Sequence, residues 1–138
     1  MVITGEIILR TQGDGDTLDI TAKVQKHITD SGINNGVATV FVTGSTACIT
    51  TIEFEPGLVA DLQKLWERLV PKNIPYEHDS RWGDGNGYAH VRASLLGASL
   101  TVPFTNMKLA LGTWQQIILV DFDNRPRQRT VIVQVMGE

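Results

Sequence analysis

The chain has a single cysteine among its 138 residues, so no internal disulfide can form. Proteins that fold without disulfides are typical of reducing compartments, and we expect this one to be cytoplasmic. Cys48 lies within the apolar run ACITTIEF, which favours a small residue of the hydrophobic core over a reactive thiol.

An excess of positive charge is also missing. Lys and Arg number 12 against 15 Asp and Glu, which gives a formal net charge of −3. Nucleic-acid-binding domains usually carry a basic surface, so we expect no nucleic-acid partner. The one concentrated basic run, RPRQR at 125–129, is expected to form a solvated turn between two strands.

Long hydrophobic runs are absent as well. No apolar stretch approaches the length of a membrane span, and Glu6 and Arg10 interrupt the N-terminal segment where a signal peptide would lie. We therefore expect no membrane association. No repeat, linker or low-complexity tract divides the chain, which predicts one domain over residues 1–138.

What the chain does contain is a succession of strand patterns with few helices. Alternating or β-branched apolar runs predict strands at 2–11, 36–44, 47–54, 99–104, 108–111, 113–122 and 128–136. Helical spacing predicts helices from Asp16 or Thr17 to Gly32, over 57–70 and from Tyr88 to Leu96. Short links join most neighbours, so we expect an α+β domain in which a mostly antiparallel sheet or sandwich packs with about three helices.

The most informative segment is YEHDSRWGDGNGYAHVR, residues 76–92. It gathers histidines, carboxylates and alternating glycines: His78, His90, Glu77, Asp79, Asp84, Gly83, Gly85 and Gly87. Hydrophobic packing does not require such a loop, so we expect binding or catalysis. Two imidazoles with nearby carboxylates suit a divalent metal such as Mg²⁺ or Zn²⁺, although no diagnostic ligand spacing is present.

The same segment also suits an anion. The sequence GDGNG leads into the predicted helix 88–96, whose N-terminal amides attract phosphate, and Gly85, Asn86 and Gly87 would bind that ligand. Arg92 offers a forked contact to a phosphate group. The plainer alternative is that Asn86 caps the helix and the glycines shape an exposed turn.

General acid–base catalysis is a further interpretation. Imidazole titrates near neutral pH, so His78 or His90 can carry protons. Glu53, at the end of the strand predicted over 47–54, is a third catalytic candidate, whereas a glutamate in that position is commonly just solvated. The chain has no P-loop and no Gly-x-Gly-x-x-Gly after a leading strand, so the common nucleotide-binding fingerprints are absent.

Four segments of the chain resemble a known family in sequence, order and spacing. They are residues 43–71, 76–97, 95–104 and 109–134, and the most specific match is the tetrapeptide Gly-Thr-Trp-Gln at 112–115. Together they cover nearly the whole chain and resemble the YjbQ family, whose members are often described as secondary thiamine-phosphate synthases.

This resemblance implies a compact α+β fold that assembles into a homotrimer, with a polar pocket near the subunit boundaries. It also implies a weak thiamine-phosphate synthase activity, which joins a pyrimidine diphosphate to a thiazole phosphate and releases pyrophosphate. The acidic, polar and glutamine positions of the family motifs fall on Glu53, Asp61, His78, Asn86, His90 and Gln115. As the signature glutamine, Gln115 is expected to contact the ligand.

Roles for the other matched residues follow from the same resemblance. His78 and His90 would be metal ligands or proton carriers, with Glu53 as a carboxylate directed at the metal. The loop Gly83–Gly87 and Arg92 would bind the phosphates of a small phosphorylated molecule.

Three positions depart from the family pattern. Tyr88 stands where relatives commonly have the first histidine of a His-x-His pair, Gly44 and Ser45 lie where many relatives have a histidine, and Met107 replaces a usual glycine. If the family pocket holds metal through the paired histidines, this chain would bind it poorly, through Tyr88, or not at all. The alternative function is therefore a non-catalytic trimeric protein that binds a small phosphorylated ligand or a divalent metal.

Overall fold

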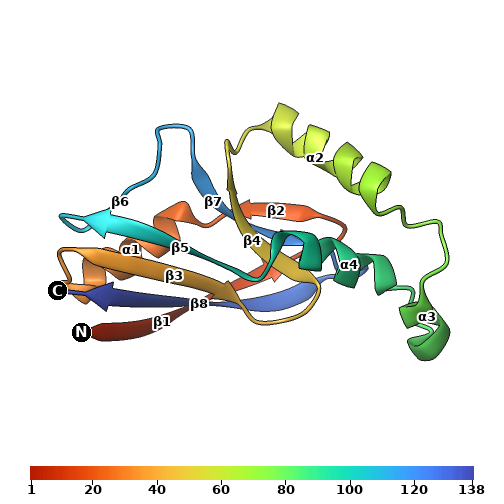
Figure 1. Cartoon of the computed structure of the whole chain (residues 1–138), viewed down its shortest axis with the longest axis horizontal. Coiled ribbons are helices and arrows are strands. Elements are labelled where there is room, and N and C mark those ends of the chain that lie inside the picture. The colour runs from red at the N-terminus through yellow and green to blue at the C-terminus, as the bar shows by residue number, and fades with distance from the viewer.

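The computed structural model describes all 138 residues as two antiparallel β-sheets and four helices (Figure 1). The strands are β1 (Val2–Thr11), β2 (Asp16–Asp19), β3 (Gly36–Val42), β4 (Ala47–Ile52), β5 (Ser99–Thr105), β6 (Lys108–Leu109), β7 (Gln116–Asp121) and β8 (Arg127–Gly137). The helices are α1 (Thr21–Ser31), α2 (Pro56–Leu69), α3 (Glu77–Trp82) and α4 (Gly87–Leu96). None of these helices has the length and hydrophobicity needed to cross a lipid bilayer.

The two sheets confirm the expected α+β class. The five-stranded sheet has the order β1-β8-β3-β5-β6 and the three-stranded sheet has the order β2-β7-β4. Every pairing between neighbouring strands is antiparallel. Strand β8 pairs with β1 along the whole length of β1, so the two chain termini lie side by side at one end of the molecule (Figure 1).

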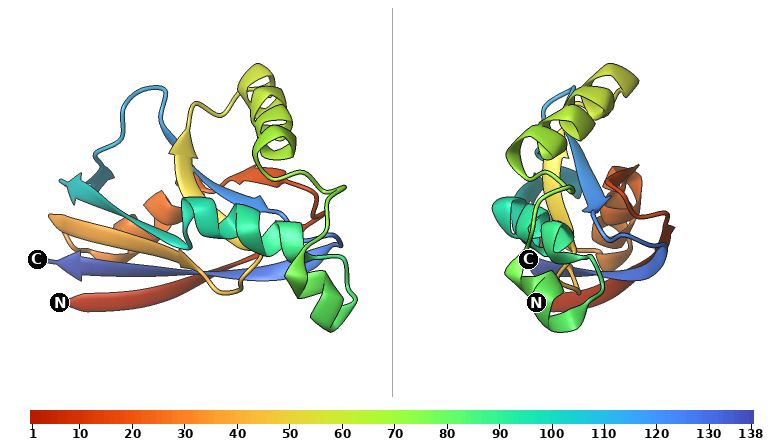
Figure 2. Two further views of the ribbon diagram at one scale, coloured as in Figure 1. Left: turned by 45° about the vertical axis from the view of Figure 1, so that its right-hand side comes forward. Right: turned by 90° about the vertical axis from the view of Figure 1, so that its right-hand side faces the viewer.

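The main hydrophobic core fills the space between the sheets and α1. Alternate side chains of β8, namely Val131, Val133 and Val135, point inward and are fully buried, as the period-2 geometry of a strand requires. Helix α1 closes this core with Val24 and Ile28. The remaining helices lie away from this core, around the three-stranded sheet (Figures 1 and 2).

Strand β7 is buried on both faces, which explains its continuous apolar run. Ile117 and Leu119 belong to the main core, whereas Ile118 and Val120 join a second, smaller cluster. A strand covered on both sides needs no polar alternation. The second cluster holds α4 against the three-stranded sheet, and it thereby places the polar segment at the start of α4 beside the end of β7.

Residues 16–19 form a strand rather than the first turn of the predicted helix. All four pair with β7, and the helix starts only at Thr21. The Asp19 Oδ1 atom accepts hydrogen bonds from the backbone N–H (2.9 Å) and the hydroxyl (2.7 Å) of Thr21, which fix this start. Leu18 and Ile20 fit a strand period as well as a helix period, so their spacing alone does not separate the two structures.

Helix α3 is an element that the sequence pattern does not predict. None of its six residues is buried, so it has no apolar periodicity to reveal it. It ends at Gly83, which adopts a left-handed conformation with φ of 67°. Helix α3 matters for the candidate site, because it places His78 and Asp79 on one short turn that precedes α4.

Helix α2 projects away from both sheets in every view (Figures 1 and 2). The Glu55 carboxylate caps it by accepting hydrogen bonds from two backbone N–H groups of the first turn. The only buried residue of the helix is Trp66, while Leu69 on the same apolar face is 60% exposed. Trp66 meets the edge of Phe122 with ring centroids 5.2 Å apart, so its indole is the main anchor of the helix, and the partly buried Leu62 and Leu65 pack against the same cluster.

Cys48 is the core residue that its apolar surroundings predict. It lies fully buried in β4 within the smaller cluster. Burial is the main cause that raises the pKa of its thiol to about 12, so the thiol stays protonated and unreactive at neutral pH.

We expect Trp66→Ala to lower the free energy of unfolding by about 3–5 kcal/mol, because it deletes the single buried anchor of α2. The exposed Leu69→Ala is the matched control and should change stability by less than about 0.5 kcal/mol. Urea unfolding followed by circular dichroism measures both. Equal losses in the two variants would contradict the role of Trp66 as the main anchor.

Candidate functional site

The residues of the predicted loop gather where α3, α4 and the turn after β7 meet. Helix α3 lies at the end of the molecule, and the chain then turns through 83–86 into α4 (Figure 1). Asp123 and Asn124 follow β7 and contact this loop directly. The site is therefore formed by two parts of the sequence about forty residues apart.

His78 and His90 lie face to face at the centre of this site. Their ring centroids are 4.4 Å apart, with an angle of 40° between the ring planes. His78 Nδ1 lies 3.5 Å from Asp84 Oδ1 and 3.7 Å from Asp79 Oδ1. This nitrogen is inaccessible to solvent and has no hydrogen-bond partner. We call His78, Asp79 and Asp84 the histidine–carboxylate cluster, because their ligand atoms lie within 4.8 Å of one another.

Backbone hydrogen bonds hold the two carboxylates of this cluster. Asp79 Oδ1 accepts a hydrogen bond from the N–H of Gly87 at 2.8 Å, and Asp84 Oδ1 accepts one from the N–H of Asn86 at 3.2 Å. Gly87 is needed here, because a Cβ atom on it would lie 2.7 Å from the Cβ of Tyr76. The first glycine of the helix thus serves close packing against Asp79 and Tyr76.

Asn86 fastens the loop to the turn after β7. Its Nδ2 donates to Asp123 Oδ2 at 3.1 Å, and its Oδ1 accepts from the N–H of Asn124 at 3.1 Å. Asn124 Nδ2 in turn donates to the carbonyl of Asp84 at 2.8 Å. Asn86 occupies the N-cap position of α4 but makes no side-chain cap, so the capping part of the simpler alternative is wrong, whereas Gly83 and Gly85 form the exposed turn that it expected. The buried amide of Asn86 instead sets the position of the loop.

The basic run RPRQR is not the solvated turn that its composition predicts. Arg129 is buried, and its guanidinium binds Asp121 in a forked pair with distances of 2.6 and 2.8 Å. Arg127 Nε lies 3.2 Å from Asp123 Oδ2. Of the three arginines only Arg125 is exposed, as expected, together with Pro126 and Gln128. The arginines occupy alternate inward positions of β8, so the strand period carries them into the protein.

Thr46 completes this buried network. Its hydroxyl oxygen accepts a hydrogen bond from Arg129 Nη2 at 2.5 Å and donates to Asp123 Oδ2 at 2.9 Å. Burial alone would raise the pKa of Asp123, but hydrogen bonds from Asn86 and Thr46, together with the cation of Arg127, hold it below its ordinary value of 3.8. The hydrogen bonds to Asp121 raise the pKa of Arg129 above its ordinary value.

A cavity of about 260 Å³ opens between this network and His90. Every residue of its wall is polar or glycine: Gly44, Ser45, Thr46, Asp84, Asn86, His90, Asp123, Arg127 and Arg129. Asp84 belongs to the histidine–carboxylate cluster, and His90 contacts His78 of that cluster. The cluster and the cavity are therefore continuous. We refer to this space as the polar cavity.

Arg92 lies behind the site rather than in it. It is only 2% exposed, and its Nε and Nη2 donate to the carbonyl of Val70 at 3.0 and 2.8 Å. Nη2 also donates to Glu67 Oε2 at 2.9 Å. These bonds satisfy the C-terminal end of α2, which is a structural task, and the phosphate role expected for Arg92 finds no support in this geometry.

Tyr88 also points away from the cluster. It is buried, its hydroxyl lies 3.4 Å from Asp14 Oδ1, and the guanidinium of Arg92 stacks 4.9 Å from its ring centre. Burial first, and then the charge of Asp14, raises the pKa of Tyr88 to about 12. Tyr88 is therefore a packing residue on another side of α4.

Two further expected residues lie at the opposite end of the three-stranded sheet. Glu53 is exposed just beyond β4, and Gln115 directly precedes β7. Each strand has six residues, so roughly 20 Å separates that end of the sheet from the end beside the polar cavity. Neither residue joins His78 and His90, so the structure divides the predicted site residues into two groups.

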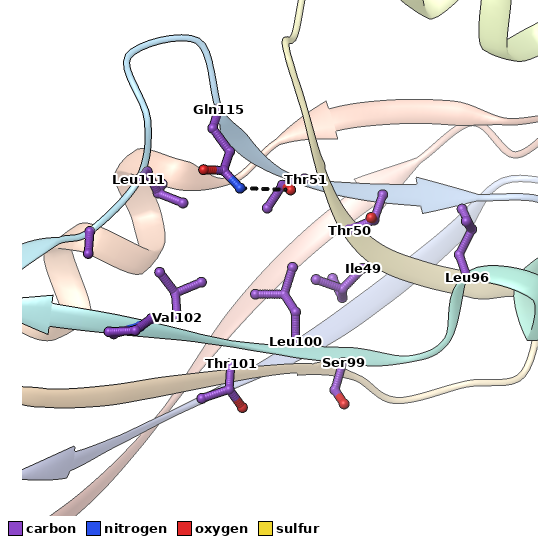
Figure 3. A pocket seen from close by; sticks show the side chains of 12 residues that line it. Ile49, Thr50, Thr51, Leu96, Ser99, Leu100, Thr101, Val102, Leu111 and Gln115 are labelled. Atoms are coloured by element: carbon purple, nitrogen blue, oxygen red, sulfur yellow. Dashed lines mark hydrogen bonds between the residues drawn. The ribbon is translucent and has the colours of Figure 1, made fainter.

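Gln115 instead lines a larger cavity of about 440 Å³ between β4 and β5 (Figure 3). Its Nε2 donates to Thr51 Oγ1 at 3.1 Å and its Oε1 accepts from the N–H of Gly112 at 3.1 Å. Leu100 and Val102 of β5 supply apolar walls, and no ionisable side chain lines the space. The role of Gln115 in the structure is to hold the loop before β7 against β4.

The arrangement defines a class of protein: an α+β chain of two antiparallel sheets in which a histidine–carboxylate cluster opens into a wholly polar cavity. The chain belongs to the UPF0047 protein YjbQ-like family, whose model matches residues 5–138. This confirms the resemblance seen in the sequence motifs.

Relatives in several microorganisms share this family. A UPF0047 protein from Methanothermobacter thermautotrophicus is 40% identical over 137 residues, which cover 99% of this chain and 94% of the relative. The UPF0047 protein YugU of Bacillus subtilis is 34% identical over 131 residues, with coverage of 94% and 96%.

Solved structures agree with the fold along its whole length. The crystal structure of a YbjQ-like protein of unknown function from Sulfolobus solfataricus P2 superposes with a TM-score of 0.94 at 34% identity, covering 100% of this chain and 99% of that one. A yjbq/upf0047 family protein from Clostridium acetobutylicum gives a TM-score of 0.87 at 37% identity, with coverage of 96% and 99%.

The low pKa of Asp123 predicts an acid-sensitive contribution to stability. Because its folded pKa lies below 3.8, the ionised carboxylate stabilises the protein above that pH, and this contribution is lost as the pH falls through the folded value. We expect Asp123→Asn to cost about 2 kcal/mol near neutral pH and less in acid. Urea unfolding of both proteins at neutral pH and at about pH 3 measures the difference. The exposed Asp61→Asn is the control, and a cost for Asp123→Asn that grows in acid would contradict the assignment.

Proposed function

We propose that this site binds a divalent metal and acts on a small phosphorylated substrate held in the polar cavity. The specific reaction that family resemblance suggests is the thiamine-phosphate synthase reaction. In it the bond between the pyrimidine methylene carbon and the diphosphate oxygen breaks, and its electron pair leaves with pyrophosphate. The thiazole ring nitrogen then forms the new carbon–nitrogen bond.

The observation that carries the metal assignment is the unpartnered His78 Nδ1. A buried ring nitrogen without a hydrogen bond is costly, and here it faces two carboxylate oxygens at 3.5 and 3.7 Å. A cation held by His78, Asp79 and Asp84 would satisfy all three groups at once. One nitrogen and two oxygen donors suit Zn²⁺, Mn²⁺ or Mg²⁺ in decreasing order of preference for nitrogen. When bound, the ion would stabilise negative charge on a departing pyrophosphate.

His90 is the candidate proton carrier. It is the one imidazole that lines the polar cavity, and it is only half-buried, so it reaches both the cluster and a bound ligand. Imidazole exchanges protons near neutral pH, which suits protonation of a leaving pyrophosphate. The hydrogen bond between Asn86 and Asp123 holds the loop that leads into α4, the helix that carries His90.

We expect metal-stripped protein to take up one equivalent of Zn²⁺ or Mn²⁺, and His78→Ala to weaken this uptake by about ten- to a hundredfold, because it removes the only nitrogen donor of the cluster. Elemental analysis after dialysis and titration calorimetry measure the stoichiometry and affinity. His27→Ala on α1 removes the same group far from the cluster and is the matched control.

Turnover of the two thiamine precursors is then measured with and without the bound metal. Metal-dependent product that disappears in His78→Ala and His90→Ala supports the synthase. Metal or phosphate binding without product supports the alternative, a non-catalytic binding protein of the same family. Failure of His78→Ala to change metal uptake would rule out the cluster as the metal site.

The homotrimer implied by the family is part of the same proposal. Trp114, in the loop before β7, is a large apolar side chain that is 72% exposed. Tryptophan is enriched at interfaces between proteins relative to the rest of the surface, so Trp114 is the candidate contact residue. We expect light scattering at micromolar concentration to give three times the chain mass of 15.2 kDa. Trp114→Ser should shift the population to monomer, and a monomeric parent protein would contradict the trimer.

A further inference from the structure

Two arginines that line the polar cavity leave guanidinium donors unused, and from this we infer that the cavity is an anion subsite in which Arg127, Arg129 and Ser45 hold a phosphate or pyrophosphate group. The inference rests on the proposed function for the class of substrate. It moves the phosphate contact from Arg92 and the glycine-rich loop to the other wall of the site, where residues from β8 and the β3–β4 link meet.

The first step is to count how the two arginines use their donors. Each guanidinium has five N–H groups. Arg129 uses its Nε and Nη2 on Asp121 and Thr46, whereas its Nη1 donates to no protein group. Arg127 contacts Asp123 only through Nε, and neither of its terminal nitrogens donates to the protein. Both cations line the cavity, so the unused donors are available to a ligand there.

The second step is to count the acceptors on the same wall. Most of the acceptor capacity of Asp123 is used, because its Oδ2 accepts from Asn86 at 3.1 Å and from Thr46 at 2.9 Å while its Oδ1 accepts from the N–H of Arg125 at 3.2 Å. Asp84 is the remaining carboxylate, and it belongs to the cluster where we place the cation. The charge of Asp123 is thus already paired with Arg127, and Asp84 faces His78 on the side of the cluster.

Gly44 shows that the backbone leaves room for this guanidinium. A Cβ atom on Gly44 would lie 2.6 Å from Arg129 Nη1, and its φ of 122° is one that other residues rarely adopt. Nη1 therefore reaches the cavity wall beside Gly44 and Ser45, whose hydroxyl forms no bond within the protein. Glycine at this position keeps the unused donor open to the cavity.

Size limits the ligand to a small group. At about 260 Å³ the cavity is smaller than most ligand pockets, which measure roughly 300–1,000 Å³. It suits one or two phosphoryl groups rather than an entire cofactor. Because Asp84 is shared between cavity and cluster, a diphosphate seated here lies next to the proposed metal, which is where a departing pyrophosphate would need charge stabilisation.

The test is titration of inorganic pyrophosphate into the purified full chain, followed by calorimetry and phosphorus NMR. We expect binding in the presence of EDTA that strengthens when Mg²⁺ or Mn²⁺ is added. Arg127→Gln should weaken binding by about ten- to a hundredfold, since it removes a charged donor. Ser45→Ala should weaken it by about two- to tenfold. Arg125→Gln removes the same charge two residues away from an exposed position outside the cavity, and we expect it to bind nearly as the parent does.

The outcomes separate the inference from the proposed function. Arginine-dependent binding in EDTA supports the subsite even if neither metal uptake nor turnover is found. Equal weakening by Arg127→Gln and Arg125→Gln would reduce the effect to general charge attraction and overturn the inference. No binding of pyrophosphate under either condition, or equally tight binding of the dicarboxylate malonate, would also overturn it. Circular dichroism of each variant confirms that it is folded before binding is compared.

Discussion

The forked pair between Arg129 and Asp121 is the contact on which the site depends. Two charges placed in the interior are costly to desolvate, and only close geometry with additional hydrogen bonds offsets that cost. Here Asp121 accepts from Arg129 at 2.6 and 2.8 Å and from the Thr11 hydroxyl at 2.5 Å. The pair joins β7, β8 and β1 at the end of the main core. Everything polar in the site extends outward from this point through Thr46, Asp123 and Asn86.

This network explains how an apolar fold presents a polar site. The inward positions of β8 are valines along most of the strand and become arginines only in its first residues. At the same end, the carboxylates of Asp121 and Asp123 face these arginines from the neighbouring segment at the end of β7. The layer between the sheets therefore changes from hydrocarbon to ion pairs within a few residues. The polar cavity and His90 lie next to this ion-paired layer. The layer therefore supports the loop before α4.

Much of the fold could be predicted from the sequence, because strand and helix periods were clear. The hairpin strands, α1 beyond its first turn, α2 and α4 fall close to the predicted ranges. The start of α1 could not be placed, since Leu18 and Ile20 satisfy two periods. Helix α3 could not be found, because none of its residues is buried.

The site was predicted only in part. Its position at His78, Asn86 and His90 followed from an unusual concentration of polar residues in one segment. The contribution of Arg127 and Arg129 could not be read from local sequence, since a basic run near a turn usually points to solvent. The useful signal was the alternation of charge at every second position on both sides of the turn, which matches a strand with one inward face. For Arg92 the prediction failed in the opposite sense. Its position beside the loop indicated a ligand contact, but its guanidinium binds the carbonyl of Val70 at the end of α2.

The limited burial of α2 has a consequence for the local stability of the protein. Helix α2 buries only Trp66 fully and otherwise packs with partly buried side chains such as Leu62 and Leu65, so we expect its local unfolding to cost less than unfolding of the sheets. Arg92 connects the C-terminal end of α2 directly to α4, the helix that carries His90. The network around Arg129 and Asp121 is held by many close contacts, whereas α2 is held by few. The site lies between these two parts of the protein.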